Sequence, residues 1–105
     1  MQLDGLYIHV SERLALLRGR PLALTPTELH LLVTLVRAPG HLFEYCYLAE
    51  RVLKYACTER EARANLQVHI NNLRRKLGDD ARKPRHIHCV RGVGYRWDGR
   101  SLENL

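Results

Sequence analysis

The fold is decided by two stretches of the sequence, LQVHINNLRRKL at residues 66–77 and RGVGYRW at residues 91–97. In the first, apolar residues recur at the spacing of one helical face, and cations gather toward its end. In the second, two glycines interrupt a run of basic and β-forming residues, which is typical of a tight turn between strands. The sequence therefore predicts a basic amphipathic helix followed by a basic hairpin that pairs residues 87–90 with 95–97.

The residues before the first predicted helix favour a small antiparallel sheet. Segments 6–10 and 14–17 are apolar or rich in β-forming residues, and a turn at 18–21 leads to a third apolar segment at 22–24. Short strands joined by tight turns usually pair with their neighbours in the chain. We therefore expect these segments to form one sheet.

Three helices are predicted, and two of them have clear start signals. Thr25 is a good N-cap, Pro26 is tolerated at the first helical position, and Glu28 completes a capping box. Thr58 and Glu61 repeat the capping box, so the third helix is expected at about residues 59–77, ending at Gly78. The second helix is expected at about residues 45–53, where it would bury Leu48, Val52 and one or more of Tyr45, Cys46 and Tyr47.

The charge is unevenly distributed along the 105 residues. The net charge is +6, but residues 1–50 have a balance of −1 and residues 51–105 a balance of +7. A cationic half usually marks a surface that binds a polyanion, and nucleic acid is the commonest polyanion. On charge alone, a solvated face without a ligand remains equally compatible with this pattern.

Three cysteines, an odd number without C-x-x-C spacing, argue against a disulfide framework and fit a reducing compartment. The spacing gives no support to a zinc site, so we expect no metal and no cofactor. The candidate ligands considered for such a site are Cys46, Cys57, His69, His88 and Cys89.

Other classes of protein are disfavoured by what the sequence lacks. No apolar run approaches the ~20 residues of a membrane span, and residues 1–5 do not have the order of a secretory signal. We therefore expect a cytoplasmic location and no membrane partner. Neither a carboxylate pair nor a nucleophile–base arrangement is evident, so no enzymatic activity is expected.

The third predicted helix has an unusual outer face. Its core stripe comprises Ala62, Leu66, Ile70, Leu73 and Leu77. The opposite arc comprises Glu61, Ala64, Asn65, Val68, Asn71, Asn72 and Arg75, flanked by Arg63, Arg74 and Lys76. Small residues let a helix approach the floor of a major groove, a valine can contact a thymine methyl, and asparagine can pair with adenine. The face thus favours DNA recognition, although an ordinary solvated face with one exposed valine is the alternative.

Arg91 adds an independent indication of the same ligand. It lies at the tip of the hairpin beside two glycines, where it can enter a minor groove or follow the phosphates without a backbone clash. A surface arginine in an ordinary turn is the alternative.

In order and spacing, three motifs resemble the OmpR/PhoB-type winged-helix effector domain of bacterial response regulators. They are LTPTEL at residues 24–29, VHI with LRRKLG at 68–78, and the segment I-x-x-VRGVGYR at 87–96. The resemblance covers about residues 3–98 of a single domain spanning 1–105. It implies an α+β winged helix-turn-helix fold with an amino-terminal antiparallel four-stranded sheet, three helices and a carboxy-terminal β-hairpin wing.

The resemblance also implies a function: sequence-specific binding of double-stranded DNA and regulation of transcription as the output domain of a two-component response regulator. The recognition helix, about residues 59–77, would lie in the major groove, and the wing, about residues 86–97, at the minor groove. The expected base-reading residues are Asn65, Val68, Asn71 and Asn72; the expected backbone contacts are Arg63, His69, Arg74, Arg75 and Lys76; Arg91 and Tyr95 are expected at the wing. The implied ligand is double-stranded promoter DNA with tandem half-sites, bound by a monomer that associates head to tail on DNA.

The resemblance further implies partners. RNA polymerase is a possible partner of the loop at residues 54–58, and a receiver domain is expected to be missing from this sequence, which starts almost on its first strand. Several positions depart from the family, including Asn72, Cys89, Ala64 and Leu53. Only Ala64, Leu53 and the apolar Tyr45–Tyr47 support an alternative function, a protein-interaction module that contacts RNA polymerase or another regulator.

Overall fold

The computed structural model describes residues 2–3, 5–54, 58–80 and 82–98. In chain order the elements are β1 Gln2–Leu3, β2 Leu6–His9, β3 Leu14–Leu17, β4 Arg20–Pro21, α1 Pro26–Val36, β5 Phe43–Glu44, α2 Tyr45–Leu48, the π-helical turn η1 Ala49–Leu53, α3 Glu59–Leu77, β6 Ile87–Val90 and β7 Gly94–Trp97. They form two antiparallel sheets and three helices, η1 being the continuation of α2.

The amino-terminal sheet has four antiparallel strands in the order β1-β2-β3-β4. In β2, Leu6 and Ile8 are buried and Tyr7 between them is exposed, as expected for a sheet with one face on the core. The prediction of a strand at 22–24 is wrong, because the fourth strand is Arg20–Pro21. Beyond it the chain bends, since the N–H of Leu24 donates to the carbonyl of Leu22 at 3.0 Å.

Both predicted capping boxes are confirmed. At α1 the Thr25 hydroxyl accepts the N–H of Glu28 at 3.1 Å, and the Glu28 carboxylate accepts the N–H of Thr25 at 3.0 Å. At α3 the same two bonds join Thr58 and Glu61 at 3.2 and 2.9 Å. The helix α3 begins at Glu59 and ends at Leu77, as the sequence predicts. Gly78 follows it as the C-cap, with φ 74°.

The second helix differs from the regular one that was expected. After one turn of α-helix in α2, the chain widens into η1, where the N–H of Lys54 donates to the carbonyl of Ala49 at 3.1 Å, five residues back. Lys54 then ends the segment in the left-handed region with φ 64°. Leu48 and Val52 are buried as predicted, and so is Tyr45, whereas Tyr47 is exposed.

The carboxy-terminal hairpin is part of a larger sheet than predicted. Strand β5, which precedes α2, pairs with β7, so this sheet has the order β5-β7-β6. The pairing joins Phe43 to Tyr95 and Glu44 to Gly94. The wing therefore rests on a third strand rather than standing as an isolated hairpin.

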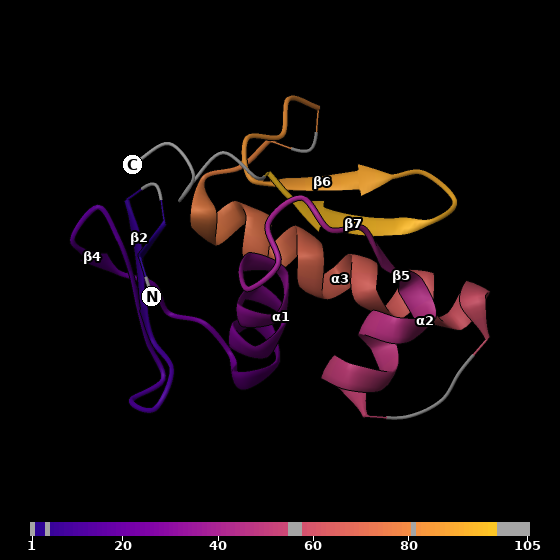
Figure 1. Cartoon of the computed structure of the whole chain (residues 1–105), viewed down its shortest axis with the longest axis horizontal. Coiled ribbons are helices and arrows are strands. Elements are labelled where there is room, and N and C mark those ends of the chain that lie inside the picture. The colour runs from indigo at the N-terminus through magenta and orange to yellow at the C-terminus, as the bar shows by residue number, and fades with distance from the viewer. Residues whose placement is uncertain (1, 4, 55–57, 81, 99–105) are drawn as a thin grey trace.

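The core lies where the helices and both sheets meet. Helix α1 lies between the amino-terminal sheet and α2, and α3 runs behind α1 (Figure 1). The predicted core stripe of α3 is confirmed, because Ala62, Leu66, Ile70, Leu73 and Leu77 are all buried. Within the described ranges, no helix combines the length and the apolar character needed to cross a membrane.

Candidate nucleic-acid interface

Burial of one stripe of α3 leaves the opposite face of the helix in solvent. Val68 is 59% exposed, more than any other exposed large hydrophobic side chain in the described part of the chain. Asn65 and Asn71 are exposed on the same face, and Arg63 and Arg75 are exposed as well. The structure thus brings together an apolar group, amides and cations on one face of one helix.

Asn72 is half-buried and engaged by a neighbour one turn away. A guanidinium nitrogen of Arg75 donates to the Asn72 side-chain oxygen at 3.2 Å. Bidentate pairing with adenine uses both the oxygen and the nitrogen of the amide. The Arg75 bond therefore occupies one of the two acceptor lone pairs of the Asn72 oxygen and leaves the other for a base.

Arg74 is not available for the backbone contact that was expected of it. Its side chain is 8% exposed, and its Nη2 donates to the carbonyl of Ile87 at 3.0 Å. Position 74 lies at the edge of the core stripe, on the side of the helix that β6 covers. Arg74 therefore joins α3 to β6 inside the domain and leaves the set of candidate phosphate contacts.

Lys76 is also committed inside the domain. Its Nζ lies 2.6 Å from the carboxylate of Glu28, a residue of α1 that is only 2% exposed. Burial alone would raise the pKa of Glu28, but the hydrogen bonds from Lys76 and Thr25 and the charges of Lys76 and His69 outweigh it and lower that pKa. The expected phosphate contact of Lys76 is therefore replaced by an ion pair between α3 and α1.

Tyr95 does not form part of the wing surface, contrary to expectation. It is 4% exposed, and its ring packs edge-on against that of Tyr45 at 5.6 Å between centroids. Burial first, and then the nearby Cys89 and Tyr45, raise the pKa of Tyr95 to about 12. Because Tyr45 is buried too, the exposed Tyr47 and the half-buried Cys46 are what remains of the Tyr45–Tyr47 segment for the alternative interaction surface.

Arg91 is exposed at the turn between β6 and β7, as predicted. The turn is closed by a bond of 2.9 Å from the N–H of Val93 to the carbonyl of Val90, and Gly92 within it has φ 79°. A residue with a Cβ is sterically disfavoured at this positive φ, so the glycine allows the tight turn that carries Arg91.

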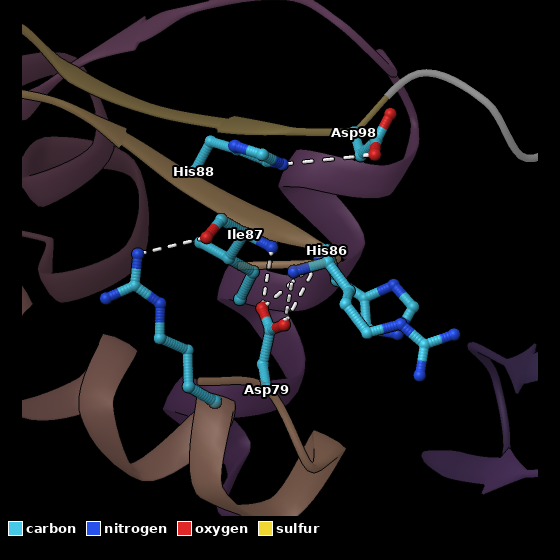
Figure 2. Close-up of polar contacts among 7 residues, drawn as sticks. Asp79, His86, Ile87, His88 and Asp98 are labelled. Atoms are coloured by element: carbon cyan, nitrogen blue, oxygen red, sulfur yellow. Dashed lines mark hydrogen bonds and ion pairs between the residues drawn. The ribbon is translucent and has the colours of Figure 1, made fainter. Parts of the chain in front are cut away.

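A residue that the sequence reasoning missed fixes the start of the wing. The carboxylate of Asp79 accepts the backbone N–H groups of Arg85 at 2.6 Å, His86 at 3.2 and 3.3 Å, and Ile87 at 2.9 Å (Figure 2). Asp79 directly follows the glycine that ends α3. We name this arrangement the Asp79 clamp. The signal in the sequence that could have predicted it is an acidic residue directly after the glycine that ends α3.

The remaining predicted positions are tested only in part. His69 is half-buried and close enough to Glu28 for its charge to act on that carboxylate. In the loop 54–58, Lys54 and Thr58 are described, while residues 55–57 lie outside the described residues. Among the described residues, no group of three or more His, Cys, Asp or Glu side chains is arranged to hold a metal ion; Cys57 is not one of them.

Comparison with known proteins identifies the family. Residues 19–97 match the family described as "Transcriptional regulatory protein, C terminal". The chain belongs to this family. The matched range contains α1, α3 and both wing strands, so the candidate interface lies within it. The resemblance to OmpR/PhoB-type effector domains is thereby confirmed.

Individual members of the transcriptional regulatory C-terminal family agree with this assignment. The chain is 41% identical over 78 residues to the transcriptional regulatory protein CseB of Streptomyces coelicolor, covering 74% of this chain and 30% of CseB. The chain spans about a third of the length of the curated relatives it matches.

Two solved structures have the same winged-helix fold over nearly their whole length. The RstA DNA-binding domain of Klebsiella pneumoniae, solved in complex with the RstA box, has a TM-score of 0.85 at 25% identity and covers 95% of this chain and 97% of that chain. The DNA binding domain of CpxR from E. coli has a TM-score of 0.83 at 30% identity and covers 94% and 95%, respectively.

Proposed function

We propose that this domain binds double-stranded DNA with sequence preference and thereby regulates transcription as the output domain of a two-component response regulator. The observation that carries the proposal is the exposed face of α3, where Val68 stands among amides and cations on a fold shared with a domain solved on DNA. An ordinary solvated face would not be expected to place the most exposed large apolar side chain of the described residues, Val68, at the centre of a basic helix.

The contacts divide between bases and backbone. Asn65, Val68, Asn71 and Asn72 would meet base edges in the major groove, and Asn72 accepts a hydrogen bond from Arg75 beside them. Arg63, His69 and Arg75 would contact phosphates, and Arg91 would lie at the minor groove. With Arg74, Lys76 and Tyr95 removed, the proposed interface is smaller than the sequence suggested.

The wider proposal concerns the protein to which this domain corresponds. The domain would be monomeric in solution and bind tandem promoter half-sites head to tail, in the cytoplasm, under control of a receiver domain. Support comes from the family match and from relatives about three times as long as this chain. Contact with RNA polymerase through residues 54–58 remains part of this proposal, and no enzymatic activity is included in it.

Selection from a pool of random duplex DNA, repeated at two salt concentrations, tests the proposal. Enrichment of a tandem motif with affinity that falls steeply with salt is the expected result, because each phosphate contact releases counterions. Salt-sensitive binding without enrichment would contradict sequence preference. Absence of binding at low salt would overturn DNA binding itself and favour a protein-interaction role for the exposed Tyr47.

Replacing Asn72 with alanine should relax the preference at one base pair by ~1–3 kcal/mol, since a lost base contact affects only the sequences that used it. Arg91→Ala is the matched comparison and should weaken all sites about equally. Both are measured by titrating each variant against the selected site, its single-base variants and random DNA. Equal losses on selected and random DNA for Asn72→Ala would contradict its assignment to a base.

Breaking the Asp79 clamp should weaken DNA binding through the wing. In Asp79→Asn one acceptor oxygen is replaced by an NH₂ group, which cannot accept the backbone N–H groups of Arg85 to Ile87. The start of the wing would then be held less firmly, and DNA binding would have to supply the free energy that orders it. We expect a loss of roughly five- to thirtyfold, or about 1–2 kcal/mol. In the Arg91→Ala background the same change should cost little. A loss of the same size in both backgrounds would show that Asp79 does not act through Arg91.

A further inference from the structure

A groove outside the candidate DNA interface opens beside α1. It has a volume of about 650 Å³ and lies between the turn after β2, the exposed side of α1 and the end of η1. Its lining residues, as far as the chain is described, include none from α3, β6 or β7. An occupant of this groove would therefore leave the recognition helix and the wing free.

The floor of the groove is apolar and belongs to the edge of the core. Leu29 and Val33 contribute from α1, and Val52 and the half-buried Leu53 contribute from η1. At the rim, Val10 is 42% exposed in the turn after β2. This floor can bury apolar side chains that a partner brings to it.

The rim is cationic. The ionisable residues that line the groove are Arg13, His30, Arg37 and Lys54, and no carboxylate lines it among the described residues. Arg13, Arg37 and Lys54 are exposed, and none of them forms an ion pair with a described carboxylate. The positive charges also reach the interior of the groove. Burial first, and then the charges of Lys54, Arg51 and Arg37, lower the pKa of His30, which lines the groove.

We infer that this groove docks a short acidic segment of a partner protein. Apolar side chains of the segment would lie against Val10 and Leu53, over the buried Leu29, Val33 and Val52, and its carboxylates would meet the three exposed cations of the rim. The combination of an apolar floor and three exposed cations that pair with none of the described carboxylates favours an occupant that carries both apolar groups and negative charge.

Two other occupants fit the groove less well. A nucleic-acid strand would need aromatic platforms for its bases, and the described lining offers no Phe, Tyr or Trp. A second copy of this chain carries a net charge of +6, which opposes the cationic rim. An acidic segment meets neither obstacle, and its docking goes beyond DNA binding because it uses a different surface.

Selection of displayed random 12-residue peptides on the whole chain tests the inference. The selected peptides are then compared on Arg37→Glu/Lys54→Glu, and on Arg20→Glu/Arg82→Glu as a control with the same change in charge at exposed positions outside the groove. Thermal unfolding of all variants verifies that they fold. Single substitution Arg37→Glu provides a second variant in which the left-handed backbone of Lys54 is untouched.

We expect enriched peptides to combine Asp or Glu with apolar residues and to lose at least tenfold in affinity on the groove variant but not on the control. Amide shifts in a ¹⁵N-labelled domain should then gather at Leu29, Val33 and Leu53, and saturating duplex DNA should leave the affinity unchanged. Enrichment of basic peptides, equal losses on both variants, shifts confined to α3 and the wing, or displacement by single-stranded DNA would each overturn the inference. So would the absence of any enriched peptide. Failure of DNA selection would leave this outcome unaffected, so the two proposals are tested separately.

Discussion

Gly94→Ala should destabilise the domain by more than ~3 kcal/mol, the range of severe overpacking against an immobile neighbour. A Cβ added at Gly94 would lie 1.8 Å from the carbonyl oxygen of Phe43 and 2.9 Å from the Cα of Glu44, both of them backbone atoms. No side-chain rotation relieves such a contact, so β5 must separate from β7. Because β5 contributes only two residue pairs, this separation removes the third strand from the sheet.

Urea unfolding of the variant and the parent measures this effect. Gly92→Ala is the matched control, two residues before Gly94 and in the turn that precedes β7. There an added Cβ meets nothing within 4 Å, and only the positive φ of 79° opposes it, at a cost of about 1–2 kcal/mol. If Gly94→Ala costs no more than Gly92→Ala, the close approach of β5 to β7 is wrong.

Lys76→Met should destabilise the domain by about 3–5 kcal/mol at neutral pH, since it leaves a carboxylate buried without its partner. Glu28 is 2% exposed and lies 2.6 Å from the ammonium group of Lys76. The companion change Lys76→Met/Glu28→Gln removes both charges and should recover part of the loss. Urea unfolding of the single and double variants checks this, and purely additive losses would contradict a direct pairing.

The same pair predicts a dependence on pH with a defined sign. In the parent the pKa of Glu28 is lowered from its ordinary value of 4.5, so the stability it contributes is present above about pH 4.5 and is lost as pH falls through the folded pKa. In Lys76→Met, burial is left as the main influence and acts in the opposite direction. The difference in unfolding free energy between parent and variant should therefore shrink on acidification, and a difference independent of pH would contradict this account.

The two capping boxes predicted the starts of α1 and α3 to the residue. Each capping box uses groups three residues apart, so Thr58 and Glu61 determine the start of α3 whatever the rest of the chain does. The core stripe was equally predictable, because only one face of α3 carries a continuous apolar row. These features require no knowledge of neighbouring elements.

The errors at Arg74, Lys76 and Tyr95 share one cause, which is that the spacing of residues in a sequence does not show which element packs beside them. Arg74 and Lys76 flank the stripe at similar angles to residues that stay exposed, but β6 covers one and Glu28 of α1 pairs with the other. The alternation of residues in the strand does not show which face of the sheet is buried, and the side chain of Tyr95 lies on the face that packs against Tyr45. Such contacts join residues far apart in the chain, and the spacing of residues along one element does not predict them.

Strand β5 and the Asp79 clamp were missed for a related reason. Two residues are too few to show the alternation of a strand, so Phe43 and Glu44 gave no signal until their partners in β7 were known. Asp79 is one acidic residue in a polar loop. Its role depends on three backbone N–H groups that approach it only in the folded chain.

The Asp79 clamp and the Arg74 bond to Ile87 tie the end of α3 to the start of β6 (Figure 2). If the helix occupies a major groove and Arg91 the next minor groove, these bonds would restrict changes in the distance between the two contacts. The duplex must then adjust its own twist and groove width to match. Base steps that no side chain touches would thus influence affinity through their stiffness, and the domain would select DNA by mechanics as well as by chemistry.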